Sequence, residues 1–316
     1  MRRIAGIVLA LFLWPTIAVS ASIAGTASSD LEKQVEALFD PSHDALSVKL
    51  AVDAMVEPST NPDRIRQELD DLTAVLQPML AGATGSHAKL KVLRRFLYEP
   101  GDWNGNRPFA YDMADPLGSK LSNKLLGRYL ETRRGNCVTM PMLVMILGRR
   151  IGLDMTLAVA PHHVFVKFTD ELGKVWNLEA TSGAGYTRDI WYRKNLPMTD
   201  HSVAKGTYMR ALNDDQVKAV MATYLVEHFM AEKQPEQAIA AANVILRHHP
   251  GDAIMHVWRG SAFGLMLRRD VVARYFDLGA LPPEIRAYAD ALYMHNIADF
   301  QKAEALGWTE QDGETQ

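Results

Sequence analysis

The stretch that decides the fold runs from residue 130 to residue 184 and contains three motifs. They are R-R-G-N-C (133–137), which holds the only cysteine, P-H-H-V-F-V-K (161–167) and W-N-L-E-A (176–180). The first motif opens a predicted helix, and the other two lie on predicted strands. A thiol, a histidine and a carboxylate in this order are what a nucleophilic site of the Cys–His–acid type requires.

The apolar pattern after the cysteine predicts a helix that stops at Gly152. Asn136 is a suitable N-cap, so we expect Cys137 in the first turn, where backbone N–H groups and the helix dipole favour a thiolate. Pro141 has no N–H and leaves the carbonyl of Cys137 without its helical partner. Either the first turn is distorted, or the regular helix begins one or two residues later. In both cases Cys137 stays at the N-terminal tip.

Three strands are predicted, at residues 156–159, 163–168 and 175–179. Asn177 and Glu179 share one face of the third strand because side chains alternate along a strand. If that face meets His163, Glu179 accepts the ring N–H and fixes the imidazole, and Asn177 lies one pleat away. His162 is expected to point away from His163, and we treat it as secondary.

In the catalytic interpretation Cys137 attacks a carbonyl carbon, His163 is general base and then acid, and Glu179 stabilises the charged imidazole. The N–H of Cys137 is one oxyanion donor, and Asn123 and Asn177 are candidates for a second. The alternative is a buried packing cysteine, a strand histidine with satisfied hydrogen bonds and an exposed glutamate. A metal site made of the same three residues is a third interpretation, but no H-E-x-x-H or paired-cysteine spacing supports it.

The N-terminus predicts export. Arg2 and Arg3 precede an apolar run at residues 4–14, and small residues follow at 18–21, a pattern typical of a signal peptide over residues 1–21. The run is short for a membrane span, which needs about 20 apolar residues, and an uncleaved anchor is the alternative. We expect a periplasmic or secreted protein that is not held in a membrane after cleavage.

The length, net charge and cysteine count of the chain limit the classes of protein to which it can belong. The chain has 316 residues and is 48% hydrophobic, long enough for a substantial core and two domains. Its formal net charge of −3 suggests neither nucleic acid nor an acidic membrane surface as a partner. An exported chain with one cysteine cannot form an internal disulfide, so that thiol is easier to explain if it does chemistry.

The rest of the chain is predicted to be mostly helical. Helical periodicity covers residues 27–97 and, after a loop at 99–118, residues 122–132. It returns from residue 214 to the end, with a weak repeat at a spacing of 34 that pairs Phe229 with Phe263 and Ala242 with Phe276. This spacing resembles tetratricopeptide repeats. Because the repeats are few, we expect the tail to pack on the first domain.

The motifs N-x-x-L-x-R-x-L-E-T-R-R-G-N-C (123–137), P-H-H-V-F-V-K and N-L-E-A-T-S-G (177–183) resemble the transglutaminase-like branch of the papain-like superfamily. They are most similar to its bacterial members with a tetratricopeptide-like tail. The resemblance covers residues 119–185 closely and the tail loosely. It implies an α+β fold in which the cysteine-bearing helix packs on a small antiparallel sheet. The implied organisation is a catalytic domain at 27–205, including the N-terminal helices, and an all-α repeat domain at 212–310.

The resemblance assigns the family's triad to Cys137, His163 and Glu179. Two positions depart from the family pattern: His162 stands where a glycine is frequent, and Glu179 stands where aspartate is usual. The implied function is an exported cysteine hydrolase or acyltransferase that acts on amide or peptide substrates without a cofactor. The alternative is a catalytically inactive protein of this family that binds a protein partner through its core and its helical repeats.

Overall fold

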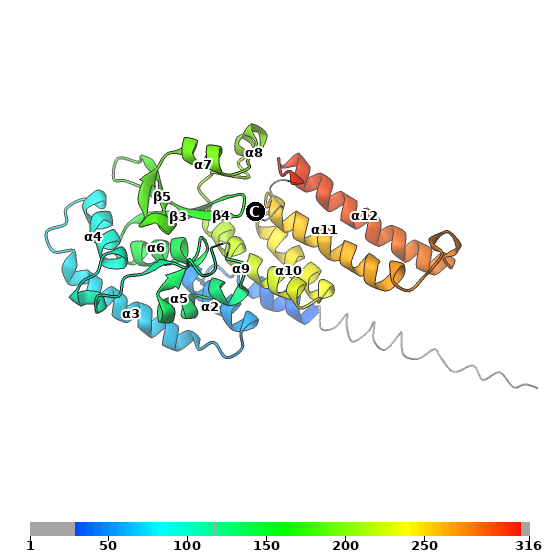
Figure 1. The fold of residues 1–316 in the computed structure, drawn as a ribbon, viewed down its shortest axis with the longest axis horizontal. Helices are drawn as coiled ribbons and strands as arrows, with labels where there is room; N and C mark the ends of the chain where they lie inside the picture. Colours follow the sequence, from blue (N-terminus) through cyan, green and yellow to red (C-terminus); the bar gives the residue numbers. More distant parts are fainter. Residues whose placement is uncertain (1–28, 117, 311–316) are drawn as a thin grey trace, which may run out of the picture.

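The computed structural model of the chain describes residues 29–116 and 118–310. Many helices surround a small antiparallel sheet, so the predicted α+β class is confirmed (Figure 1). The predicted signal peptide lies outside the described residues. No helix within the described ranges is both long enough and apolar enough to cross a membrane.

The α-helices are a first helix at residues 29–37, α2 (Ala45–Val56), α3 (Pro62–Met79), α4 (Ser86–Tyr98), α5 (Leu126–Thr132), α6 (Thr139–Arg150), α7 (Asp189–Asn195), α8 (Asp200–Ala204), α9 (Asp214–Ala231), α10 (Pro235–His248), α11 (Ala253–Leu267) and α12 (Pro283–Ala305). The strands are β1 (Ala110–Tyr111), β2 (Arg134–Gly135), β3 (Asp154–Ala160), β4 (His163–Thr169), β5 (Val175–Glu179) and β6 (Gly185–Thr187). Short helical turns are η1 (Asp102–Asn104), η2 (Leu121–Lys124), η3 (Ala180–Ser182), η4 (Arg268–Val272) and η5 (Leu278–Ala280).

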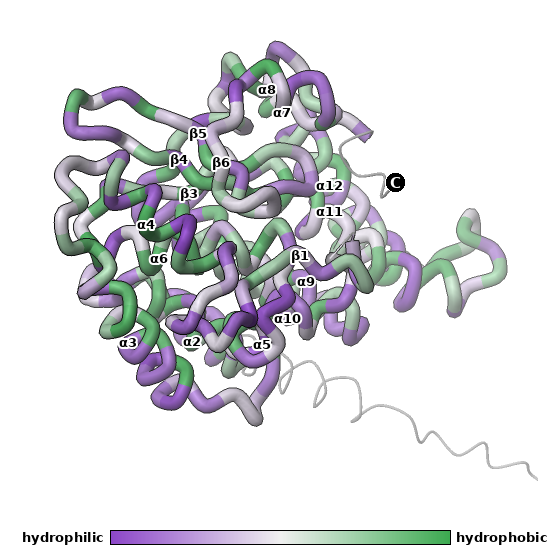
Figure 2. Tube along the Cα trace, turned by 60° about the vertical axis from the view of Figure 1, so that its left-hand side comes forward, coloured by the Kyte–Doolittle hydropathy of each residue, from purple (hydrophilic) through white to green (hydrophobic). Residues whose placement is uncertain are grey.

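Helix α6 is the centre of the molecule. All of its residues from Thr139 to Gly148 are buried, as expected of a helix that is apolar on every side. It contacts α3, α4 and α5 as well as β3 and β4. At Gly148 an added Cβ would lie 2.3 Å from the sulfur of Met155, so glycine leaves room there for the side chain of Met155 on β3. Figure 2 shows hydrophobic residues gathered around this helix and the sheet, with hydrophilic residues in the outer turns.

The sheet has the order β3-β4-β5-β6, and all its pairs are antiparallel. Its first three strands lie at the predicted positions. Ala160 pairs with His163 across a two-residue turn, and Lys167 pairs with Asn177. Strand β6 was not predicted, because three residues that begin with a glycine carry no readable alternation. The register brings the ends of β4 and β5 close to the N-terminal tip of α6.

The helix predicted over residues 122–132 is wrong in its first half. The chain forms η2, becomes extended at Leu125 and only then begins α5. The cause is a buried pair on α2: Lys49 donates to the carbonyl of Lys124 (2.8 Å), and Asp53 accepts the N–H of Leu126 (2.8 Å). These two tertiary hydrogen bonds bend the chain between the carbonyl of Lys124 and the N–H of Leu126. Local periodicity cannot show such a bend.

The C-terminal tail is helical, as predicted, and it packs on the first part of the chain. Helix α9 contacts α2, α10 and β3, and one apolar cluster includes residues from the first helix through α11. The end of α12 returns to the sheet side, where Thr207 Oγ1 donates to the carbonyl of Leu306 (2.6 Å). The hairpin of α11 and α12 projects from the body, as Figure 1 shows.

Candidate active site

Cys137 lies in a turn at the N-terminal tip of α6, two residues before the helix begins. The late helix start agrees with the argument from Pro141, which has no N–H for the carbonyl of Cys137. Asn136 is not the N-cap by position, but its side chain caps the helix. Its Oδ1 accepts the N–H groups of Val138 (3.0 Å) and Thr139 (3.2 Å). Cys137 itself is half-buried.

His163 is the first residue of β4, and Glu179 is the last residue of β5. The Nε2 atom of His163 lies 2.7 Å from Oε2 of Glu179. The other side of the ring is hydrogen-bonded to Cys137, and Nδ1 is the nitrogen left for this bond. The imidazole therefore lies between the thiol and the carboxylate.

The protonation of His163 follows from this position. Burial by itself lowers the pKa of His163, but the hydrogen bonds and negative charges of Cys137 and Glu179 outweigh burial and raise the pKa to about 9. Burial raises the pKa of Glu179, and its bonds to His163 and Thr181 reverse this, so the pKa of the carboxyl lies below its usual value. At neutral pH a charged imidazolium is paired with an ionised carboxylate.

Two residues hold Glu179, and sequence reasoning missed both. Thr181 donates its N–H (3.0 Å) and its hydroxyl to Oε1 of Glu179. Tyr192 on α7 is fully buried and donates its hydroxyl to Oε2 (3.0 Å), the oxygen that also binds His163. The ring of Tyr192 stacks on Phe165 at 4.3 Å. With four donors on its two oxygens, the carboxylate is fixed in place as an acceptor.

His162 lies in the turn between β3 and β4, and its expected place on the strand is wrong. Its φ of +53° is in the left-handed region, and Pro161 precedes it, which suits a type II turn. This conformation explains why glycine is frequent at this place in the family. The carbonyl of His162 lies 3.5 Å from the sulfur of Cys137, so the backbone of this residue contacts the thiol, although the residue is exposed.

The two asparagines considered as oxyanion donors are engaged elsewhere. The amide nitrogen of Asn177 donates to Asp189 (2.6 Å) and its oxygen accepts from Lys167 (2.7 Å). The amide nitrogen of Asn123 donates to Asp115 (2.8 Å). Neither amide is available to a substrate, because each is already saturated by protein partners.

A metal ion bound by Cys137, His163 and Glu179 would have to compete with the hydrogen bonds that Glu179 already makes. Both oxygens of Glu179 are filled by His163, Tyr192 and Thr181. Across residues 29–116 and 118–310 there is no group of three or more His, Cys, Asp or Glu side chains arranged to hold a metal. The arrangement suits proton transfer and nucleophilic attack.

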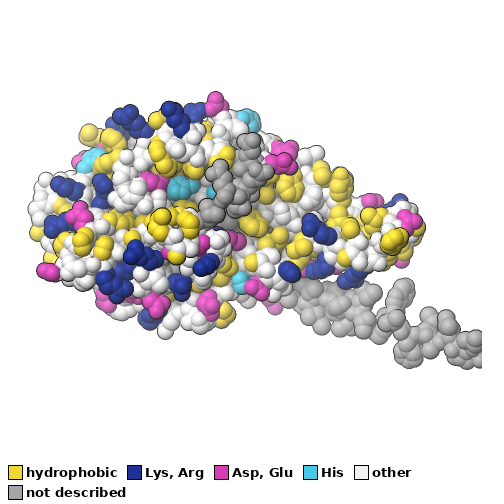
Figure 3. All heavy atoms as spheres, viewed as in Figure 1, with side chains coloured by type: hydrophobic (Ala, Val, Ile, Leu, Met, Phe, Trp, Pro, Cys, Tyr) yellow, Lys and Arg dark blue, Asp and Glu magenta, His cyan; other side chains and the backbone are white. Residues whose placement is uncertain are grey.

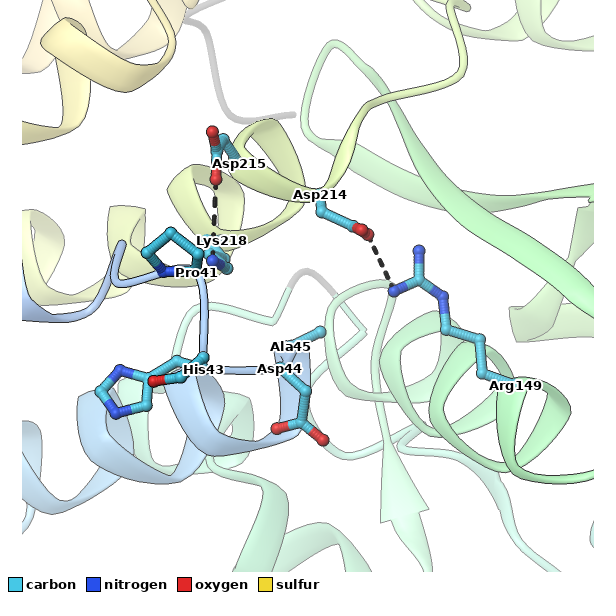
Figure 4. A pocket seen from close by; sticks show the side chains of 9 residues that line it. Pro41, His43, Asp44, Ala45, Arg149, Asp214, Asp215 and Lys218 are labelled. Carbon is cyan, nitrogen blue, oxygen red and sulfur yellow. Dashed lines mark ion pairs between the residues drawn. The ribbon is translucent and has the colours of Figure 1, made fainter.

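A polar cleft of about 430 Å³ lies at the opposite end of α6, between α2 and α9 (Figure 4). Two ion pairs lie among the residues that line it. Arg149 lies 3.0 Å from Asp214, and Lys218 lies 3.6 Å from Asp215. Because Arg149 and Cys137 are at opposite ends of the helix, this cleft is separate from the thiol.

Comparison with known proteins finds one matching family. Residues 63–219 match the family described as the Transglutaminase-like superfamily. No curated protein matches the chain, and no solved structure does. The matched range contains Cys137, His163 and Glu179 together with Thr181 and Tyr192.

Proposed function

The chain carries a domain of the transglutaminase-like superfamily over residues 63–219, and on this basis we propose that it is a cysteine hydrolase or acyltransferase. Cys137 is the proposed nucleophile, His163 the general base and acid, and Glu179 the residue that orients and stabilises the imidazolium. The single observation that carries the proposal is the position of the His163 ring between Cys137 and Glu179.

The proposed reaction begins when the Cys137 sulfur attacks the carbonyl carbon of an amide or ester. A C–S bond forms, and the carbonyl oxygen becomes an oxyanion. As the tetrahedral intermediate collapses, the C–N or C–O bond breaks, and His163 gives its proton to the leaving group. A thioester on Cys137 remains. Water then attacks it in hydrolysis, or an amine attacks it in acyl transfer, with His163 taking the proton of the nucleophile. The C–S bond breaks, the acyl product leaves, and Cys137 is restored.

The sheet supports this chemistry by holding the histidine still. Glu179 is bound by Thr181 and Tyr192, so the carboxylate keeps one orientation, and the bond of Glu179 to Nε2 keeps Nδ1 directed at Cys137. A fixed hydrogen-bond partner of this kind sets which ring nitrogen carries the proton. Catalysis therefore does not depend on reorganising the site after substrate binds.

The proposal is tested by acylation with 4-nitrophenyl acetate, followed by release of 4-nitrophenolate. We expect a burst equal to one acetyl group per protein, no burst with Cys137→Ala, and a burst rate at least about ten-fold lower with His163→Ala. Glu171→Gln, a change at an exposed carboxylate bound to Ser86, is the control and should leave the burst unchanged. A burst that is independent of both Cys137 and His163 would contradict the proposal.

The alternative function, an inactive interaction module, has one observation in its favour. Large apolar side chains are exposed on and near the projecting α11–α12 hairpin, where Figure 3 shows hydrophobic atoms at the surface. They are Val272, Phe276, Leu278, Tyr288, Tyr293 and Met294. This alternative predicts that Cys137 reacts no faster than it does in the His163→Ala variant, so the same acylation experiment separates the two functions.

A further inference from the structure

Asn136, the residue before Cys137, accepts most of the backbone N–H groups at the N-terminal tip of α6. Asn136 is 1% exposed, and both its backbone and its side chain are bonded. Its Oδ1 accepts from the N–H groups of Val138 and Thr139, and its carbonyl accepts the N–H of Met140 at 3.1 Å. Three of the four N–H groups at residues 137–140 are therefore bound to one residue.

The remaining N–H is that of Cys137. It has no acceptor within residues 29–116 and 118–310. The residue after Met140 is Pro141, which has no backbone N–H to donate. An exposed helix tip normally offers several N–H groups to an anion, but at this tip only the amide of the nucleophile is left without an acceptor among the described residues.

The side chain of Asn136 is itself fixed by a hydrogen bond to the segment around Asn123. Its Nδ2 donates to the carbonyl of Asn123 at 3.2 Å. The side chain of Asn123 is fixed in turn by Asp115, whose carboxylate also accepts the N–H groups of Ser119 (3.0 Å) and Lys120 (3.1 Å). The amide plane of Asn136 thus cannot rotate without breaking a buried bond, and its oxygen stays on Val138 and Thr139.

From this arrangement we propose that Asn136 is a positioning residue that reserves the N–H of Cys137 as the oxyanion donor. The inference rests on the proposed function. By binding the neighbouring N–H groups, Asn136 orients the turn so that the amide of Cys137 points to the place where the carbonyl oxygen of an acyl substrate gains charge. Asn123 acts through Asn136 and not as an oxyanion donor itself.

The proposal separates two reactions of the same thiol. Alkylation by iodoacetamide occurs at a CH₂ carbon: the C–S bond forms, iodide leaves, and no oxyanion develops. Acylation by 4-nitrophenyl acetate passes through an oxyanion before 4-nitrophenolate leaves. A residue that only positions the oxyanion donor should affect acylation and spare alkylation, because alkylation depends on the Cys137–His163 pair alone.

The experiment measures both rates for the wild type, Asn136→Ala and Asn136→Ser, with the signal of Cys137→Ala subtracted. For Asn136→Ala we expect acylation to fall at least about ten-fold, in line with the loss of one oxyanion donor, and alkylation to stay within about three-fold. Asn136→Ser keeps an acceptor for the N–H of Val138 and should recover part of the acylation rate. Asn104→Ala is the matched control, since Asn104 is another buried asparagine that bonds backbone groups, away from the thiol, and it should change neither rate.

The ratio of the acylation rate to the alkylation rate decides the outcome. A ratio lowered in Asn136→Ala supports the proposal, and if that variant does not fold, a lowered ratio in Asn136→Ser does so. An unchanged ratio, with both rates reduced alike or neither reduced, overturns it. If wild-type Cys137 reacts no faster than the His163→Ala variant with either reagent, the proposed function fails, and the role of Asn136 in it falls too.

Discussion

Nε2 of His163 and Oε2 of Glu179 lie 2.7 Å apart, although 16 residues separate them in the chain. Strands β4 and β5 are antiparallel neighbours, and the register places both side chains on the same face of the sheet. The glutamate side chain, one carbon longer than the aspartate usual at this place in the family, reaches the ring. The sheet thereby supplies a charged partner for one nitrogen of the His163 ring, while the thiol of Cys137 bonds the other nitrogen.

Glu179→Gln removes the negative charge at this position and keeps the size of the side chain. We expect the pKa of His163 to fall from about 9, because the charge of Glu179 helps to raise it and burial acts in the opposite direction. The imidazolium is then lost at a lower pH. An NMR titration of the His163 ring protons measures this, and its midpoint should move toward lower pH. A midpoint identical to that of the wild type would contradict the role of Glu179.

Tyr192→Phe deletes the hydroxyl that donates to Glu179 and leaves the ring on Phe165. We expect the free energy of unfolding to fall by about 1–3 kcal/mol, since a buried hydrogen bond to a charged group is lost. Tyr129→Phe is a matched control, because Tyr129 is equally buried and its hydroxyl has no partner among the described residues. Urea unfolding should show a clear loss for Tyr192→Phe and little change for Tyr129→Phe. Equal effects of the two substitutions would mean that the bond to Glu179 adds nothing.

His162→Gly should leave the thiol reactivity within about three-fold of the wild type and raise stability by roughly 1 kcal/mol. Glycine adopts a φ of +53° without the strain that a side chain brings there, and the carbonyl that faces Cys137 is retained. Thermal unfolding and the alkylation rate check this. His162→Val should do the reverse and destabilise the turn. A large loss of reactivity in His162→Gly would mean that the side chain of His162 takes part in the chemistry.

The stability of the protein should depend on the charge of His163. Its pKa is raised from 6.5 to about 9 in the folded state, so the bound proton stabilises the fold fully below pH 6.5. That contribution is lost as the pH rises through about 9. The difference in unfolding free energy between the wild type and His163→Gln should therefore shrink by up to roughly 3 kcal/mol between pH 6 and pH 10. A difference that stays constant over this range would contradict the raised pKa.

Much of this fold could be predicted from the sequence. The positions of β3, β4 and β5 follow from their alternating residues, and the position of α6 follows from its apolar run. Each of these elements is long enough to show its period. The motif around Cys137 located the helix tip, and Pro141 indicated the delayed start of α6. These features are local, so they are visible in a short window of sequence.

The features that were missed depend on contacts between distant segments. The break at Leu125 is caused by Lys49 and Asp53 on α2, and the bond from Tyr192 to Glu179 joins α7 to β5. No periodicity reports such contacts. The same reason applies to Asn177, whose amide binds Asp189, 12 residues further along the chain, and is not free to act as an oxyanion donor.

The most direct test of the central claim is the rate at which iodoacetamide alkylates Cys137 at pH 6.5 in the wild type and in His163→Ala. We expect a wild-type rate at least about ten-fold higher, because His163, whose pKa is about 9, is positively charged at pH 6.5 and attracts the anionic form of the sulfur. Equal rates in the two proteins would show that the ring does not activate the sulfur and would contradict the account.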